Sequence, residues 1–273
     1  VLTTPDTLGE GPIWHTDEQT LYWVDIEGGF ISRWSPVDDD YERQYIGMKV
    51  GCIAFREGGG LVVGAEKGIG LIDIFRTDMR LLTDNIAHPP AGLRFNDGAA
   101  DRQGRFWAGS MSLQPENKLY RMTADGTVQV MQTGLTISNG LGWSPDGRTM
   151  YLSDSGVGCI YAYDFDAQTG SVSNQRVVFD AEKHDGAGVA DGLTVDSEGY
   201  IWAAFWDGWK VARISADGQI VQTIQVPVQR PTSVAFGGPD LRDLYITSAR
   251  KDLTEQQLAQ QPNAGHLFRV YVE

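Results

Sequence analysis

The fold is indicated by the stretch Ser138-Asn-Gly-Leu-Gly-Trp-Ser-Pro-Asp-Gly-Arg-Thr-Met-Tyr-Leu-Ser-Asp154, which is followed by Cys159-Ile-Tyr-Ala-Tyr163. A polar and a small residue open a short apolar strand, and the dipeptide Asp146-Gly147 then marks a tight turn. An aromatic-rich second strand comes next, and a third strand follows after a loop. This unit predicts consecutive antiparallel strands joined by short connections.

The same unit recurs along the chain of 273 residues. The first strands of the units begin near Gly11, Gly51, Gly98, Gly140, Gly192 and Ser233, at spacings of 40, 47, 42, 52 and 41 residues. Units of this length with four antiparallel strands are typical of propeller blades, because β-solenoid coils are shorter and sandwiches do not repeat. The sequence therefore predicts an all-β, six-bladed β-propeller that forms a single domain over residues 1–273.

Ring closure requires the N-terminus. The chain ends just after the third strand of the sixth unit, His266-Leu-Phe-Arg-Val270. We expect Val1 to Thr4 to supply the missing outer strand, which would close the ring and cover an exposed sheet edge. One helix is predicted, from Thr254 to Gln260, because Thr254 and Gln257 fit a capping box.

Composition restricts the partners. The net charge is −14, from 36 acidic and 22 basic residues, which argues against nucleic acid and anionic membranes as partners. Acidity of this kind serves either general solubility or the binding of a cation. No apolar run approaches the ~18 residues of a membrane helix. The chain does not start with a basic and then an apolar segment, so no signal peptide is predicted and we expect a cytoplasmic protein.

The starts of the six innermost strands share one face of a propeller and surround its central channel. The residues there are Glu10, Val50, Asn96-Asp97, Asn139, Asp191 and Thr232. Any one Asp or Asn beside Gly is a common turn former, but recurrence at equivalent positions favours a converging set. Carboxylates that converge without a cation would raise one another's pKa. Because the set offers oxygen and no His or Cys, it favours one Ca²⁺, Mg²⁺ or Mn²⁺ ion, with Zn²⁺ or iron still open.

Four motifs carry a resemblance over the full length of the chain. They are Leu8-Gly-Glu-Gly-Pro-Ile-Trp14, Arg94-Phe-Asn-Asp-Gly98, Ser138-Asn-Gly-Leu-Gly-Trp-Ser-Pro-Asp-Gly147 and Asp191-Gly-Leu-Thr-Val-Asp-Ser-Glu-Gly199. With these motifs the chain resembles the gluconolactonase/regucalcin lactonases, the senescence-marker-protein-like family. The resemblance implies hydrolysis of sugar lactones to aldonic acids.

The resemblance also implies roles for individual residues. Glu10, Asn139 and Asp191 would correspond to the metal ligands, and Arg94 and Asn96 to residues that hold the sugar lactone. Lactone hydrolysis needs an activated water and a stabilised oxyanion. Asp191 is the best candidate for the general base, and Asp97 is the next.

Two other functions stay open: a metal-dependent esterase or organophosphate hydrolase on the same scaffold, and a non-catalytic calcium-binding protein. A deep site that binds hydroxyl groups would favour sugars, and a wide apolar mouth would favour the esterase. Trp206 and Trp209 could stack on a sugar ring or pack at the rim. Glu116, in a short third-blade loop, has no confident counterpart among substrate-contacting residues of the family. Surface or packing roles are expected for the histidines, which are His15, His88, His184 and His266.

Overall fold

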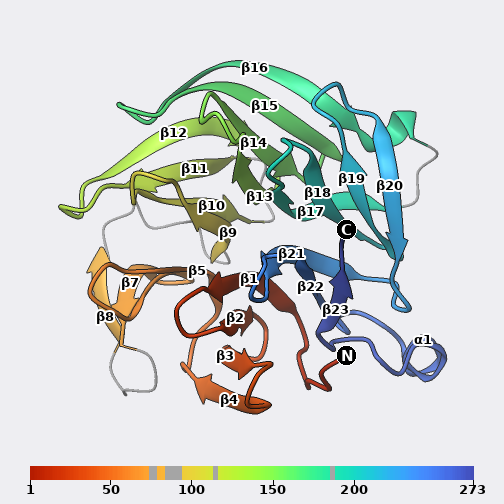
Figure 1. Cartoon of the computed structure of the whole chain (residues 1–273). Coiled ribbons are helices and arrows are strands. Elements are labelled where there is room, and N and C mark those ends of the chain that lie inside the picture. Colours follow the sequence, from red (N-terminus) through yellow and green to blue (C-terminus); the bar gives the residue numbers. More distant parts are fainter. Residues whose placement is uncertain (74–78, 84–93, 113–115, 185–187) are drawn as a thin grey trace.

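The computed structural model describes residues 1–73, 79–83, 94–112, 116–184 and 188–273. Its strands form six antiparallel sheets, five with four strands and one with three, among the described residues. Figure 1 shows that the sheets are arranged in a ring. The predicted six-bladed propeller is confirmed.

Each blade uses consecutive strands. The first blade is β1 (Gly9–His15), β2 (Thr20–Asp25), β3 (Phe30–Ser35) and β4 (Asp40–Tyr45). The second is β5 (Val50–Phe55), β6 (Leu61–Ala65), β7 (Gly68–Ile72) and β8 (Met79–Thr83). The third is β9 (Arg94–Ala100), β10 (Phe106–Met111), β11 (Asn117–Met122) and β12 (Val128–Leu135).

The remaining blades follow the same order. The fourth is β13 (Ser138–Trp143), β14 (Thr149–Asp154), β15 (Cys159–Asp166) and β16 (Ser171–Asp180), followed by the 3₁₀ turn η1 (Ala181–Lys183). The fifth is β17 (Val189–Val195), β18 (Ile201–Trp206), β19 (Lys210–Ile214) and β20 (Ile220–Gln225). The sixth is β21 (Pro231–Gly237), β22 (Asp243–Ser248) and β23 (Phe268–Tyr271), with α1 (Glu255–Gln260) between the last two strands.

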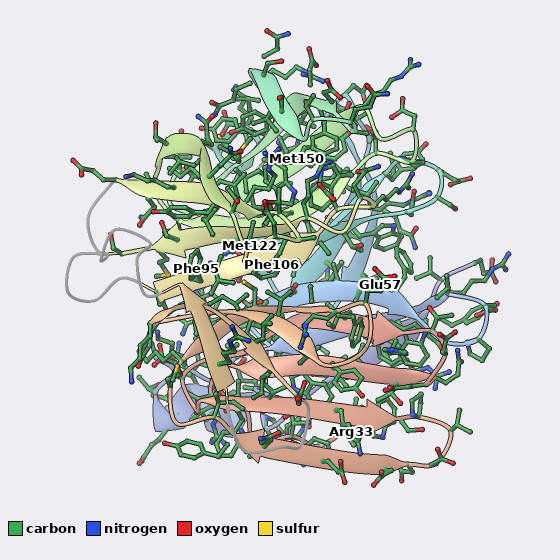
Figure 2. All side chains as sticks on the ribbon, turned by 90° about the vertical axis from the view of Figure 1, so that its left-hand side faces the viewer. Arg33, Glu57, Phe95, Phe106, Met122 and Met150 are labelled. Atoms are coloured by element: carbon green, nitrogen blue, oxygen red, sulfur yellow. The ribbon has the colours of Figure 1, made fainter. Side chains whose placement is uncertain are left out.

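The core lies between the blades. Among the described residues, six clusters of buried apolar side chains occur, one at each contact of two neighbouring blades. In the side view of Figure 2, Phe95 and Phe106 lie close to Met122, and all three belong to the cluster between the second and third blades. The innermost strands surround the axis, and each contacts the next around the ring. These strands are β1, β5, β9, β13, β17 and β21.

Every innermost strand is irregular at the position that faces the axis. Its pairing with the second strand shifts register, as at Glu10/Ile13 in β1, Ser138/Leu141 in β13 and Ala190/Leu193 in β17. Bulges of this kind bend the strand and redirect side chains. They explain how consecutive residues of a strand can leave the alternation between blade faces and point into the channel.

Glycine at these bulges lets neighbouring strands approach. A Cβ atom on Gly140 would collide with the backbone nitrogen of Leu193, and one on Gly192 would collide with the Ser233 hydroxyl. A side chain at either position would therefore push the inner strands apart. At Gly140 and Gly192 the small residue is therefore a packing requirement of the ring.

The N-terminus closes the ring with a shorter element than the sequence predicts. Leu2 forms an isolated antiparallel bridge with Leu267, with backbone N–O distances of 2.9 and 3.2 Å. The Thr4 hydroxyl donates to the carbonyl of Gly265 at 2.5 Å. The predicted helix is present with its capping box, from Glu255 to Gln260. No helix in the described ranges is long and apolar enough to cross a membrane.

Deletion of Val1 to Thr4 is expected to lower the free energy of unfolding by about 2–3 kcal/mol, because it removes three hydrogen bonds and the packing of Leu2. The measurement is thermal or urea unfolding of the shortened chain. Deletion of Val1 alone, which is 73% exposed, is the matched control and should leave stability unchanged. Coincident midpoints for the full and the four-residue deletion would show that this contact does not hold the ring.

Candidate functional site

One cavity of about 230 Å³ lies at the end of the channel where the innermost strands begin. Ligand pockets commonly measure roughly 300–1,000 Å³, so this cavity suits a single small ring. Its polar lining comes from five blades, and apolar residues complete the wall. The described residues that line it are Leu8, Glu10, Arg94, Asn96, Met111, Ile137, Asn139, Ser155, Val189, Asp191, Trp206, Lys251 and Asp252.

Three of the predicted residues form the floor. Glu10, Asn139 and Asp191 come from the first, fourth and fifth blades and are only 6%, 4% and 4% exposed. Asn139 Nδ2 donates to Asp191 Oδ1 and, at 3.0 Å, to the hydroxyl of Ser155. The Ser155 hydroxyl in turn donates to the carbonyl of Ala190 at 2.7 Å. The amide of Asn139 is thus fixed with its nitrogen toward blade five.

Burial and mutual repulsion control the charges on this floor. Burial, and then the neighbouring Asp191 and Asp97 carboxylates, raise the pKa of Glu10 well above its usual range. Burial and Asp97 likewise raise the pKa of Asp191, against the opposing effects of Asn139 and Arg94. A positive charge placed among these groups would favour their ionised forms and lower both pKa values.

Arg94 and Asn96 form a second polar unit on β9. Arg94 Nη1 donates to Asn96 Oδ1 at 2.6 Å and to the carbonyl of Phe95 at 3.1 Å. Asn96 Nδ2 donates to the carbonyl of Ser138 at 3.1 Å, which ties the third blade to the fourth. Burial lowers the pKa of Arg94, while Glu27, Glu10 and Asp191 raise it. Among the described residues, hydrogen bonds of the guanidinium involve Nη1 only, so other donors can face a ligand.

The remaining ring positions do not join this cavity. Asp97 lines a second cavity farther along the channel, because it lies with Asn96 in the bulge of β9, where the pairing with β10 shifts register. Its carboxylate accepts from the Gly98 backbone nitrogen at 2.6 Å, and burial raises its pKa to about 6. The Thr232 hydroxyl bonds to the Gly9 carbonyl and to Thr247. Val50 is buried in the apolar cluster between blades one and two.

Sequence reasoning missed several residues of the lining. Ser155 and Lys251 each follow a second strand, in the loop that returns to the face where the inner strands start. That placement is a signal that could have identified both. The apolar wall formed by Met111, Ile137 and Val189 has no such signal, because apolar residues at strand ends are common in any propeller.

The aromatic and charged residues that the sequence suggested as candidates differ in whether they line the cavity. Trp206 lines the cavity, whereas Trp209 is 40% exposed and does not line it. Glu116 is exposed, outside the lining. The rings of His15 and His184 pack against Phe55 and Phe179. His266 is partly buried, and His88 lies outside the described residues.

The donor set of the floor fits a hard cation. Asn139 Oδ1 is buried and has no hydrogen-bond partner among the described residues. Such an orphaned oxygen requires an explanation, and a bound ion supplies one. The described residues contain no group of three or more His, Cys, Asp and Glu side chains arranged for a metal. The floor instead combines two carboxylates with an amide oxygen, which suits Ca²⁺, Mg²⁺ or Mn²⁺.

The same residues lie in a region shared with known proteins. The family model described as SMP-30/Gluconolactonase/LRE-like region matches residues 8–250. The chain belongs to the SMP-30/gluconolactonase/LRE-like family. This confirms the resemblance carried by the four motifs.

Individual members of the SMP-30/gluconolactonase/LRE-like family align along nearly the whole chain. A 6-deoxy-6-sulfogluconolactonase of Pseudomonas putida is 39% identical over 100% of this chain and 94% of its own length. A pentonolactonase of Haloferax volcanii is 37% identical over 100% of this chain and 93% of its own. The solved structure of a calcium-binding protein, regucalcin, from Agrobacterium tumefaciens superposes with a TM-score of 0.91 at 28% identity, covering 99% and 92% of the two chains.

Proposed function

We propose that the protein is a metal-dependent lactonase that hydrolyses sugar lactones to aldonic acids. The observation that carries the proposal is the convergence of five buried polar side chains on one small cavity: Glu10, Arg94, Asn96, Asn139 and Asp191. The family relatives named as lactonases of a sulfonated hexose and of pentoses support it.

Glu10, Asn139 and Asp191 would hold the cation. When bound, a divalent ion supplies Lewis-acid polarisation of the ester carbonyl and of a water molecule. The calcium-binding regucalcin among the structural relatives supports a divalent ion in this protein. The orphaned oxygen of Asn139 provides a ligand without adding negative charge to two carboxylates whose pKa values are already raised.

Asp191 would serve as the general base. Its carboxylate accepts a hydrogen bond from Asn139, which fixes its orientation toward the cavity. The base takes the proton of the attacking water and later returns it to the ring oxygen that leaves as an alcohol. Arg94 and Asn96 would hold sugar hydroxyls or the ester oxygen, and the apolar wall would limit access of bulk water.

Arg94→Ala is expected to lower kcat/KM by a factor that corresponds to about 1–3 kcal/mol of lost transition-state stabilisation. This is the usual scale for a hydrogen bond to a charged group. Metal binding should persist and should not weaken, since the ligands come from other strands and the variant removes a positive charge beside Glu10 and Asp191. Arg94→Lys, which keeps the charge and loses the forked geometry, should be intermediate. Lowered stability with normal kinetics in the folded fraction would instead assign Arg94 a purely structural role through its bond to Asn96.

A pH-stat assay at defined metal concentration tests the proposal. The panel contains a hexonolactone, a pentonolactone, an unsubstituted lactone, an aryl ester and an organophosphate. Rapid hydrolysis of the sugar lactones is expected. Preference for the aryl ester or organophosphate would favour the esterase, for which a cavity of about 230 Å³ is small. Calcium binding without turnover of any member would identify a non-catalytic calcium-binding protein.

A further inference from the structure

Trp206 occupies an unusual place in the wall of the cavity. It is the last residue of β18 and lines the cavity beside the polar floor. Its ring also packs against the apolar cluster that joins the first and second blades and includes Ala249 of the sixth blade. The indole is partly buried and thus belongs both to the wall of the cavity and to the contacts that join blades.

Arg230 holds this tryptophan from the adjoining blade. Its guanidinium carbon lies 4.6 Å from the centre of the Trp206 ring. The Arg230 Nε atom donates to Asp207 Oδ1 at 2.6 Å, and its Nη1 atom donates to the carbonyl of Lys251. Only 12% of the arginine side chain is exposed. Arg230 therefore links two segments that line the cavity, the end of β18 and the segment after β22.

The turn after Trp206 is under backbone strain. Asp207 and Trp209 both have left-handed backbone angles, with φ of 59° and 57°. Residues other than glycine hold this conformation only where their surroundings enforce it, and such residues cluster at ligand sites. Gln229 supplies the enforcement: its Nε2 donates to Asp207 at 2.8 Å, and its carbonyl accepts from the Trp209 nitrogen at 3.2 Å.

We propose that Trp206 is the surface on which the lactone ring packs, and that Arg230 is a positioning residue that fixes the indole for this contact. The inference rests on the proposed lactonase function. A sugar ring offers an apolar C–H face that suits an aromatic surface, while its hydroxyl groups reach the polar floor. The guanidinium stacked on the indole restrains it through a cation–π contact. Trp206 thereby selects ring-shaped substrates of monosaccharide size.

Trp206→Leu is expected to raise KM for the preferred sugar lactone about tenfold and to change kcat by less than about threefold, because stacking contributes equally to the ground and transition states. Trp206→Phe should recover most of the loss. Trp209→Leu alters the neighbouring exposed tryptophan and is the matched control, with KM unchanged. An unchanged KM in folded Trp206→Leu would overturn the proposal. A KM for Trp206→Phe as high as that of Trp206→Leu would also overturn it.

A double-mutant cycle tests the role of Arg230. Arg230→Met should raise KM as Trp206→Leu does, and the double variant should be no worse than Trp206→Leu alone, because the arginine acts through the indole. Arg230→Lys keeps a cation near Asp207 and should restore part of the affinity. If the two single effects multiply in the double variant, the two residues act independently and the positioning role is wrong.

Binding of anhydroglucitol, a sugar ring that has no ester carbonyl, separates this inference from the proposed function. If wild-type protein hydrolyses no lactone but binds this ring, and Trp206→Leu loses the binding, the lactonase proposal fails and the stacking surface stands. If lactones are hydrolysed and Trp206→Leu binds the ring and the lactone as wild type does, the lactonase proposal stands and the stacking surface fails. Isothermal titration calorimetry measures the binding of the ring, and the pH-stat assay measures the hydrolysis of lactones.

Discussion

Asp191→Asn is expected to reduce kcat by about 10²-fold or more, and added metal should not restore it. Asparagine keeps a carbonyl oxygen that can accept from Asn139 Nδ2, so the fold should survive and some cation should still bind. Metal affinity should fall because one negative charge is lost. The proton acceptor is also lost, and a higher metal concentration repairs binding but not base catalysis.

Asn139→Ala is the comparison for this prediction. It removes a neutral ligand and leaves both carboxylates, so raising the metal concentration should recover at least part of the activity. Stability without metal offers a second readout. Loss of the Asp191 charge relieves the repulsion that raises the pKa of Glu10, so metal-free Asp191→Asn should unfold no more easily than metal-free wild type.

Full recovery of Asp191→Asn at high metal would make Asp191 a ligand only. The search for the base would then turn to Glu10, which lines the same cavity. Asp97, the second choice from the sequence, lines the other cavity of the channel, although its carboxylate still raises the pKa of Glu10 and of Asp191. The structure thus changes the order of the remaining candidates.

Removal of the metal is expected to abolish activity and to lower the thermal midpoint by roughly 5–10 °C. A ligand present at 100 times its Kd stabilises the folded state by about 2.7 kcal/mol, and each kcal/mol corresponds to about 2–4 °C in a chain of this size. The measurements are lactone hydrolysis and thermal unfolding after chelation, with metal analysis of the sample. Readdition of the ion should restore both quantities.

The size of this stabilisation should depend on pH. Without metal, the raised pKa values mean that folded Glu10 and Asp191 bind protons more tightly than the unfolded chain does. The metal-free protein therefore becomes more stable as pH falls from above the folded pKa values toward the unfolded values near 4. The midpoint difference between metal-loaded and metal-free protein should be larger at about pH 8 than at about pH 5, and metal uptake should release protons.

Two results would contradict the metal site. One is full activity after exhaustive chelation with no metal detected in the sample. The other is an equal loss of midpoint at both pH values, which would indicate that the ion binds away from Glu10 and Asp191. Glu10→Gln, which removes one ligand charge and one raised pKa, should weaken the pH dependence and serves as the matched variant.

The amino-acid sequence by itself determined the ring and the positions that face its axis. A unit that repeats every 40 to 52 residues, with a glycine or, in the last unit, a serine near the start of the inner strand, specifies both. Strand pairing is local within each blade, and residues such as Gly140 and Gly192 pack against the next inner strand. For the same reason the repeat predicts that the polar positions Glu10, Asn96-Asp97, Asn139 and Asp191 lie at one end of the channel, and the family resemblance then selects Glu10, Asn139 and Asp191 as the ligand set.

Only the tertiary structure decided which way individual side chains point. The bulges separate Asn96 from Asp97, so that these adjacent residues line different cavities. Contacts between blades distinguish Trp206, held under Arg230, from the exposed Trp209. The direction of a side chain depends on residues that are far apart in the chain and meet across blade boundaries. A local repeat does not specify the side chains of the neighbouring blade.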